Sequence, residues 1–167
     1  MVTEAVYQRI MDEVILPTVQ GMASEGHPYT GFLYAGLMIT ADGTPKVIEY
    51  NCRFGDPETQ PIMLRMRSDL VAHCLAALEQ RLDEESTDWD PRAAVGVVLA
   101  AGGYPGSYAK DLPISGLPEP ESDDAKVFHA GTRLENDQIL TTGGRVLCAT
   151  ALGESVGQAQ QRAYELT

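Results

Sequence analysis

The chain has 167 residues, of which 44% are hydrophobic and 22% are charged, and this composition is typical of a folded globular protein. Its formal net charge is −12, with 24 acidic against 12 basic residues. A nucleic-acid backbone or an anionic membrane surface would need a positive face on the protein, so we expect neither as a partner. Any polyphosphate that binds here is expected to be accompanied by a divalent cation that offsets the repulsion.

Cysteine spacing and hydropathy indicate the cellular setting. The three cysteines, Cys52, Cys74 and Cys148, lie far apart without the Cys-x-x-Cys spacing typical of thiol metal sites, and an odd number favours a reducing compartment. No run approaches the roughly 18 apolar residues of a membrane-spanning helix, and the first residues lack the basic and then apolar order of a signal peptide. We therefore expect a soluble cytoplasmic protein that does not bind membranes.

The first third of the chain predicts a helix followed by a β-hairpin. Apolar residues at helical spacing begin after Thr3, a good helix cap, and Pro17 is expected to kink or end the helix near Leu16. Two strand-like runs, residues 31–39 and 46–51, flank an Asp-Gly turn. A loop marked by Gly26, His27 and Pro28 is expected between the helix and this hairpin.

The remaining patterns predict an alternation of loops, strands and helices. Residues 53–60 are predicted to form a loop, and residues 68–82 a helix with one apolar stripe. The densest acidic run follows, and we interpret residues 83–92 as a solvated connector between two domains. Short apolar runs predict three further strands, at residues 93–101, 126–130 and 145–152. A closing helix is predicted over residues 154–166, with its apolar residues directed inward: Val156, Ala159, Ala163 and Leu166.

The second strand of the predicted hairpin carries the most informative pattern. Over residues 48–54, apolar side chains alternate with Glu49, Asn51 and Arg53, so a period of two places the polar groups on one face and a buried apolar set on the other. Carboxylate and amide oxygens suit Mg²⁺, which commonly binds a few protein groups together with substrate phosphates. The guanidinium is placed to take phosphoryl oxygens. The three residues therefore predict phosphoryl-transfer chemistry, in which a protein mainly positions groups and stabilises developing charge.

An ordinary structural interpretation fits the same residues. Glu49, Asn51 and Arg53 are compatible with a solvated strand face, and residues 55–58 with a plain turn. The density of polar and turn-forming residues directly after the hairpin favours the functional interpretation.

The stretch 47–60 carries a resemblance that spacing alone does not supply. It contains Arg-Phe-Gly-Asp-Pro-Glu-Thr-Gln, which resembles the Arg-Phe-Gly-Asp-Pro-Glu-x-Gln signature of the phosphoribosylamine–glycine ligase (glycinamide ribonucleotide synthetase) family of ATP-grasp enzymes. Further segments resemble the same family and extend the likeness over nearly the whole chain, at residues 29–38, 60–66, 102–106, 126–131 and 143–148.

The resemblance implies an α+β fold in two parts. The first is the carboxy-terminal part of an ATP-grasp domain, a hairpin or antiparallel sheet with helices, which we place with its following helix at residues 1–82. The acidic connector, 83–92, leads to a small mixed α+β domain at 93–167 that stops short of the family's carboxyl end. Family enzymes are much longer, so the amino-terminal domain and most of the ATP-grasp module, including the loop that covers ATP, are expected to be missing.

The same resemblance implies an ATP-dependent ligase of de novo purine biosynthesis. Its expected partners are ATP, glycine and 5-phosphoribosylamine, with no nucleic acid and no membrane. ATP phosphorylates glycine to glycyl phosphate, and the amine then attacks to give glycinamide ribonucleotide, ADP and phosphate. The full-length enzyme is expected to be a monomer, and this chain alone is expected to be inactive.

Individual roles follow from the resemblance position by position. Glu49 and Asn51 match the Glu-x-Asn pair that binds Mg²⁺ or Mn²⁺ between ATP phosphates. Arg53 matches the arginine that faces the transferred phosphoryl group and is the expected catalytic residue. A loop near the substrates supplies the expected substrate-binding residues, Asp56, Pro57 and Glu58.

One stretch departs from the wider ATP-grasp pattern. Many ATP-grasp enzymes place another acidic metal ligand on the preceding strand, and residues 34–38 contain none. The metal is therefore expected to depend on Glu49, Asn51 and phosphate oxygens. Two other interpretations stay open: a different ATP-grasp carboxylate–amine ligase or a carboxylase that shares the Glu-x-Asn-x-Arg pattern, and a fragment that is non-catalytic when isolated.

Overall fold

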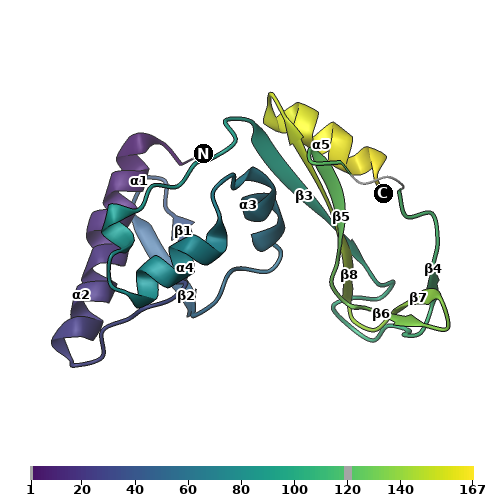
Figure 1. Cartoon of the computed structure of the whole chain (residues 1–167), viewed down its shortest axis with the longest axis horizontal. Helices are drawn as coiled ribbons and strands as arrows, with labels where there is room; N and C mark the ends of the chain where they lie inside the picture. The colour runs from purple at the N-terminus through teal and green to yellow at the C-terminus, as the bar shows by residue number, and fades with distance from the viewer. Residues whose placement is uncertain (1, 119–121) are drawn as a thin grey trace. The chain divides into compact units, whose positions relative to one another are not determined.

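The computed structural model describes residues 2–118 and 122–167 and divides the chain into two compact units (Figure 1). The first unit consists of the residues up to Gly55 together with Val71–Glu85, and the second of Asp56–Leu70 together with Ser86–Thr167. Helices and antiparallel sheets make up both units, which confirms the α+β class. The boundaries at residues 82 and 92 stay a prediction. Within the described residues, no helix reaches the length and hydrophobicity needed to cross a membrane.

The first unit begins with one long helical stretch. It contains α1 (Glu4–Ile10), a π-helical segment η1 (Met11–Ile15) and α2 (Leu16–Ser24). The Thr3 hydroxyl accepts a hydrogen bond from the Val6 N–H, as expected of an N-cap residue. The helical stretch therefore starts where the sequence predicts and continues beyond the predicted end.

The expectation that the helix ends near Leu16 is wrong, because the helical stretch accommodates Pro17 and continues to Ser24. The other expectation, a kink at Pro17, stays a prediction. Proline lacks an N–H, and its ring would clash with the carbonyl four residues earlier in a regular helix. The wider π-helical turn directly before α2 places Pro17 in the first turn of a new α-helix, where both costs are small. The Thr18 hydroxyl donates to the Val14 carbonyl over 2.7 Å, which satisfies an acceptor at this junction.

The hairpin forms as predicted. Its strands, β1 (Tyr34–Ile39) and β2 (Pro45–Asn51), pair antiparallel. Asp42 organises the turn, since its carboxylate accepts hydrogen bonds from the hydroxyls of Thr40 and Thr44 and from the Thr44 N–H. These bonds, the Thr40 hydroxyl first, lower the pKa of Asp42 to about 2.

The predicted buried apolar face of β2 is not found. Leu37 pairs with Val47 and Gly36 with Glu49, so Ile48 is an extra residue that forms a β-bulge and interrupts the period-two alternation. The Ile48 side chain is 65% exposed, and Cys52 lies beyond the end of the strand and is also exposed. The bulge thus falls on the residue directly before the predicted metal ligand.

The helix predicted over residues 68–82 is shorter in the structure. It appears as α4 (Leu70–Leu78), followed by a 3₁₀ turn η2 (Leu82–Glu84). Gln80 has a φ of 58°, which is incompatible with continuing the helix. Among the described hydrophobic residues of this unit, Val14 and Ala76 are the buried ones.

The second unit is built on a three-stranded antiparallel sheet in the order β3–β8–β5. The strands β3 (Ala93–Ala100), β8 (Arg145–Gly153) and β5 (Ala125–His129) confirm the three predicted strands within a residue or two. A short helix, α3 (Thr59–Arg65), packs on β3 and β8 and was not predicted. Its first residues lie within the stretch predicted to be a loop.

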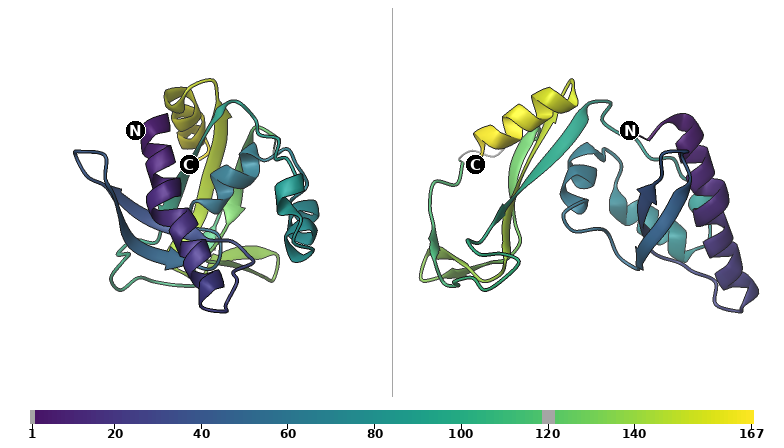
Figure 2. Two further views of the ribbon diagram at one scale, coloured as in Figure 1. Left: turned by 90° about the vertical axis from the view of Figure 1, so that its left-hand side faces the viewer. Right: turned by 180° about the vertical axis from the view of Figure 1, so that it is seen from behind.

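The closing helix α5 (Val156–Glu165) lies along the long strands β3 and β8 (Figure 2). Ala159 and Ala163 are fully buried, as predicted from their spacing, whereas Val156 is exposed, contrary to the prediction. Val156 is the first helical residue after the Ser155 cap, so its side chain lies at the end of the contact.

A smaller antiparallel sheet in the order β4–β7–β6 completes the second unit and was not predicted. Its strands are β4 (Pro113–Ile114), β6 (Thr132–Glu135) and β7 (Gln138–Thr141). Asn136 and Asp137, with φ angles of 50° and 61°, form the two-residue turn between β6 and β7.

The predicted solvated connector contains a buried carboxylate. Asp90 is only 3% exposed, so the expectation of a fully solvated run is wrong at this residue. Arg92 donates to both carboxylate oxygens, from Nε over 3.0 Å and from Nη2 over 2.8 Å, and Arg67 donates from Nη2 over 2.8 Å. Arg92 also pairs with Asp124 over 2.7 Å. These ion pairs compensate for the burial of the charge and connect the end of α3 with the start of β3.

Candidate functional site

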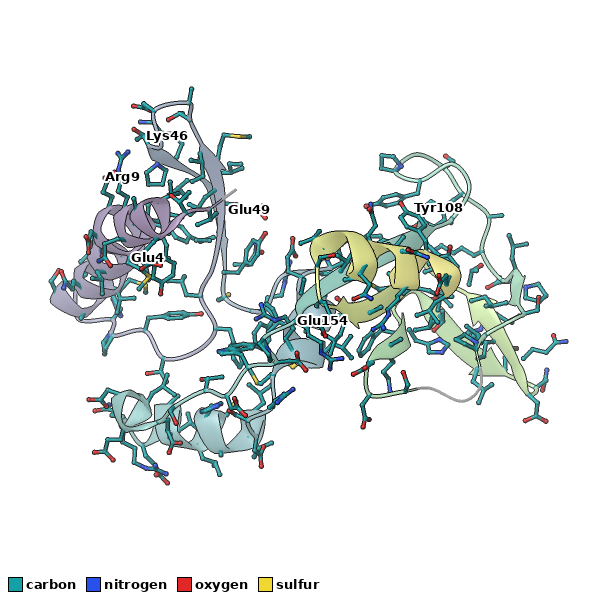
Figure 3. The ribbon with its side chains drawn as sticks, turned by 90° about the horizontal axis from the view of Figure 1, so that it is seen from above. Glu4, Arg9, Lys46, Glu49, Tyr108 and Glu154 are labelled. Carbon is teal, nitrogen blue, oxygen red and sulfur yellow. The ribbon has the colours of Figure 1, made fainter. Side chains whose placement is uncertain are left out.

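Glu49 and Asn51 lie side by side at the end of β2. The Asn51 Nδ2 donates to the Glu49 Oε1 over 3.1 Å, so the two side chains share one face, as the sequence predicts. Glu49 is exposed and Asn51 is half-buried, and Figure 3 shows Glu49 on the side of its strand that faces away from the helix bearing Glu4 and Arg9. The pair therefore places an exposed carboxylate beside a half-buried amide at the end of one regular element.

The local backbone makes room for this pair. Gly36 on β1 lies opposite Glu49, and a Cβ atom at Gly36 would lie 3.1 Å from the Glu49 Cγ. A larger residue at this position would push the Glu49 side chain away. The bulge at Ile48 sets the direction of the strand just before the pair.

The chemistry of this pair fits a hard divalent cation. Among the described residues, no group of three or more His, Cys, Asp or Glu side chains could hold a metal ion, so a site with many protein ligands is not found there. Mg²⁺ needs only one or two protein oxygens when substrate phosphates and water supply the others, and Mn²⁺ accepts the same hard donors. Glu49 and Asn51 match that requirement.

Arg53 does not lie on the strand with the other two residues. β2 ends at Asn51, and the Arg53 Nη1 donates to the Phe54 carbonyl over 2.7 Å. The prediction of a single regular face carrying all three groups is therefore wrong. The neighbouring Phe54 stacks on Phe32, with ring centroids 4.0 Å apart, which supports the chain just after Arg53.

The three predicted substrate-binding residues belong to the second unit, at the entry to α3. Asp56, Pro57 and Glu58 form a turn, and Glu58 is the N-cap residue of α3. The structure therefore places these residues on a turn that leads into a helix.

A contact to this turn was missed by sequence reasoning. Arg145, the first residue of β8, donates from Nη1 to the Asp56 carbonyl over 2.7 Å, and its Nη2 lies 3.0 Å from the Asp56 Oδ2. The two residues are 89 positions apart, and hydrophobic periodicity gives no signal for such a pair.

Further along β8, burial raises the pKa of the Cys148 thiol, and the negative charge of Asp56 raises it further. Cys148 is therefore a core residue rather than a nucleophile.

Comparison with known proteins identifies the family. The model described as phosphoribosylglycinamide synthetase, ATP-grasp (A) domain, matches residues 1–59, and the model described as phosphoribosylglycinamide synthetase, C domain, matches residues 94–167. A phosphoribosylamine–glycine ligase from Vibrio parahaemolyticus is 69% identical over 166 residues, which are 99% of this chain and 39% of the relative. The chain belongs to the phosphoribosylglycinamide synthetase family. The resemblance inferred from the signature is thus confirmed.

Further members of the phosphoribosylglycinamide synthetase family agree. The phosphoribosylamine–glycine ligase of Yersinia pestis is 67% identical over 167 residues, covering 99% of this chain and 39% of the relative. The crystal structure of phosphoribosylamine–glycine ligase from Thermotoga maritima is similar with a TM-score of 0.83 and 36% identity, covering 99% of this chain and 40% of that one. The chain spans about two fifths of the length of the curated relatives it matches.

Proposed function

We propose that the chain forms part of an ATP-dependent ligase that joins glycine to 5-phosphoribosylamine. In the proposed reaction, a carboxylate oxygen of glycine attacks the γ-phosphorus of ATP and ADP leaves, giving glycyl phosphate. The amine of 5-phosphoribosylamine then attacks the glycyl carbonyl carbon, phosphate leaves and the amine loses a proton. The products are glycinamide ribonucleotide, ADP and phosphate.

The observation that carries this proposal is the Glu49–Asn51 pair within a segment that matches the family. The two side chains lie in contact, at 3.1 Å between Asn51 Nδ2 and Glu49 Oε1, and within the residues that match the ATP-grasp domain. A carboxylate and an amide are suitable donors for Mg²⁺ or Mn²⁺ beside ATP phosphates. The high identity to proteins named phosphoribosylamine–glycine ligase supports the substrates.

In this proposal each site residue has one task. Glu49 and Asn51 hold the divalent ion, which when bound neutralises phosphate charge and orients ATP. Arg53 stabilises the negative charge of the transferred phosphoryl group. The turn with Asp56 and its two neighbours, Pro57 and Glu58, lies next to glycine and 5-phosphoribosylamine and helps to orient them.

The setting of the enzyme is also part of the proposal. We place the full-length ligase in the cytoplasm as a monomer that binds neither nucleic acid nor membranes. The net charge of −12 and three cysteines far apart in the sequence support this setting. We retain the proposed domain limits: residues 1–82 for the ATP-grasp part, 83–92 for the connector and 93–167 for the small domain.

A chimeric ligase tests the proposed function. In it, this 167-residue chain replaces the matching segment of the Vibrio parahaemolyticus relative, which is 69% identical to it. Mass spectrometry of the products is expected to find glycinamide ribonucleotide and ADP only when glycine, 5-phosphoribosylamine, ATP and a divalent metal are all present. A folded chimera that turns over bicarbonate but forms no glycinamide ribonucleotide would favour the carboxylase alternative.

The isolated chain is expected to bind ATP weakly or undetectably by calorimetry, with or without Mg²⁺. Glu49 and Asn51 supply oxygens for the metal, but in relatives more than half of the polypeptide lies outside the matched part. Tight ATP binding by the isolated chain would contradict the proposal that the nucleotide site needs the rest of a ligase.

A further inference from the structure

The contact between Arg145 and Asp56 links β8 to the turn formed by Asp56, Pro57 and Glu58, here called the signature turn. All of these residues belong to the second unit. One guanidinium donates from Nη1 to the Asp56 carbonyl over 2.7 Å and places Nη2 at 3.0 Å from the Asp56 carboxylate. It therefore restrains both the main chain and the side chain of the same residue. Arginine suits this task because its donors form a rigid fork.

The direction of Arg145 departs from the alternation of its strand. On one face of β8, Leu147 and Ala149 belong to the hydrophobic cluster that Leu166, just after α5, packs against. Cys148 and Thr150 lie on the other face, which α3 covers. A Cβ atom at Gly96 of β3 would touch both of these side chains and also Pro61 of α3. Strict alternation would place Arg145 with Leu147, away from α3.

A β-bulge accounts for this departure. β3 pairs Leu99 with Leu147 but Ala100 with Arg145, so Val146 is an extra residue. Val146 joins the same buried cluster as Leu147, as expected when the alternation shifts by one position. Arg145 is thereby directed to the face covered by α3, the helix that Asp56 precedes.

The backbone at Arg145 is held tightly, so the guanidinium extends from a rigid base. The Gly131 N–H donates to the Arg145 carbonyl over 2.9 Å, and a Cβ atom at Gly131 would lie 2.7 Å from that oxygen. On the other side, a Cβ atom at Gly144 would lie 2.3 Å from the Tyr104 ring. Both glycines therefore permit a close backbone approach that larger residues would prevent.

The exposure of the ion pair shows what it contributes. The Arg145 and Asp56 side chains are 39% and 49% exposed, and ion pairs this open to solvent contribute little to stability. Loss of the pair should therefore leave the fold nearly as stable as before. Its main consequence is geometric, because it fixes the position of Asp56.

We propose that Arg145 is a positioning residue of the ligase, which holds Asp56 and with it the signature turn in the orientation that the reaction requires. This inference rests on the proposed function. It assigns to β8 of the small domain a direct part in ordering a turn that the sequence resemblance places next to the substrates.

The chimeric ligase tests this role with two substitutions. Arg145→Ala is expected to lower kcat/KM for 5-phosphoribosylamine by about tenfold to 100-fold, since small displacements of positioning groups have effects of this size. Arg145→Lys is expected to fall between the wild type and Arg145→Ala, because lysine keeps the charge but loses the fork. The control is Arg133→Ala, which removes an arginine of similar exposure that pairs with Asp111 and Glu135 instead, and which should leave kcat/KM unchanged.

A double-mutant cycle separates positioning from a general loss of structure. If Arg145 acts through Asp56, then Arg145→Ala should reduce kcat/KM by a smaller factor in an Asp56→Asn background than in the wild type, because the carboxylate contact is already lost there while the bond to the Asp56 carbonyl remains. The melting temperatures of Arg145→Ala and Arg133→Ala should agree. The inference would be overturned if the double variant lost kcat/KM by the product of the losses in the two single variants. It would also be overturned if Arg145→Ala left kcat/KM unchanged. Either result would leave the proposed function intact.

Hydrogen exchange on the 167-residue chain provides a test that does not need ligase activity. Arg145→Ala is expected to speed amide exchange of residues 53–58 at least fivefold, while Arg133→Ala leaves it unchanged. Unchanged exchange in Arg145→Ala would overturn the inference. If the wild-type chimera is folded but inactive, the proposed function fails, and the exchange result alone decides whether Arg145 orders the turn.

Discussion

At the scale of single residues, the charges that matter are those placed in pairs. Glu49 is an exposed carboxylate in contact with Asn51, and the two form the proposed metal site, whereas Asp90 is a buried carboxylate whose partners stabilise the fold. In the sequence, Glu49, Asn51 and Asp90 are all simply polar or acidic positions, and nothing in their residue types separates their roles. The structure separates them by burial and by partner, because Asp90 is enclosed by Arg92 and Arg67 and Glu49 faces solvent.

Asp90 gives the chain a pH-dependent contribution to stability. Hydrogen bonds from Arg92, and next from Arg67, hold the pKa of Asp90 well below its usual range near 3.9. A carboxyl group whose pKa is lowered on folding adds stability that is complete above the unfolded pKa and is lost as the pH falls toward the folded pKa. Asp90 therefore stabilises the chain at neutral pH and contributes progressively less below about pH 4.

The substitution Asp90→Asn tests this contribution. It is expected to lower the melting temperature at pH 7, followed by the fluorescence of the single Trp89, and the gap to the wild type should narrow as the pH falls below about 4. Asp88→Asn, at an exposed position nearby, is the control and should change little at any pH. A gap that is equally large at pH 7 and at pH 3 would show that charge on Asp90 is not the cause.

At the scale of elements, the join between β8 and α5 limits which residues fit. A Cβ atom at Gly153 would lie 2.4 Å from the Ala159 N atom and 2.9 Å from its Cα, both of them backbone atoms that cannot easily move. At Gly157, within α5, the nearest atom to a Cβ would be the Ser155 Oγ at 3.9 Å. The two glycines therefore have opposite consequences when replaced.

Substitution of these glycines by alanine is expected to change the free energy of unfolding in opposite directions. Gly153→Ala should lower it by about 1 to 3 kcal/mol through overpacking. Gly157→Ala should raise it by about 0.5 to 1 kcal/mol, because alanine loses less conformational freedom in a helix. Urea unfolding followed by circular dichroism measures both changes. No loss of stability in Gly153→Ala would mean that α5 does not pack on β8 as closely as described, and a loss in Gly157→Ala would mean that the space around Gly157 is not open.

The elements also show how far the sequence predicts the fold. The hairpin, the three long strands and α5 follow from hydrophobic period and turn residues, which are local signals. Helix α3 was missed because Pro61 and the preceding turn residues suggest a loop, although proline is tolerated in a first helical turn. The turn at Asn136 and Asp137 carried a recognisable signal that was overlooked.

The site could be predicted only where its geometry is local. Glu49 and Asn51 meet because they lie two positions apart on one strand, so a period of two is sufficient. The bulge at Ile48 and the end of β2 before Arg53 depend on pairing with β1, which the period does not reveal. The contact from Arg145 to Asp56 spans 89 positions and arises from the packing of α3 on the sheet.

At the scale of the whole molecule, the two units differ in how much they bury. The hydrophobic cluster around Val127, Leu147 and Ala149 belongs to the second unit. In the first unit, Ile48 and Leu75 are large apolar side chains that remain exposed, and β1 and β2 form a sheet of only two strands. Sheets of two strands are marginally stable without further packing.

This difference predicts unequal protection from hydrogen exchange in the 167-residue chain. Backbone amides of β2 are expected to exchange at least tenfold faster than those of β8, because local opening costs less where few apolar contacts must break. Exchange followed by mass spectrometry on peptides from both strands measures the ratio. Equal protection of β2 and β8 would contradict the view that the second unit holds most of the stability.

The most direct test of the central claim compares the chimeric ligase with its Glu49→Ala variant. Removal of the carboxylate is expected to lower the glycine-dependent rate of ADP formation by about 100-fold or more, since the metal loses its charged ligand. The melting temperature should stay within a few degrees, because Glu49 is exposed and its described contact is with Asn51. Glu135→Ala, at another exposed carboxylate on a strand, serves as the control and should keep full activity. A folded Glu49→Ala variant with an unchanged rate would contradict the assignment of Glu49 and Asn51 as the metal-binding pair.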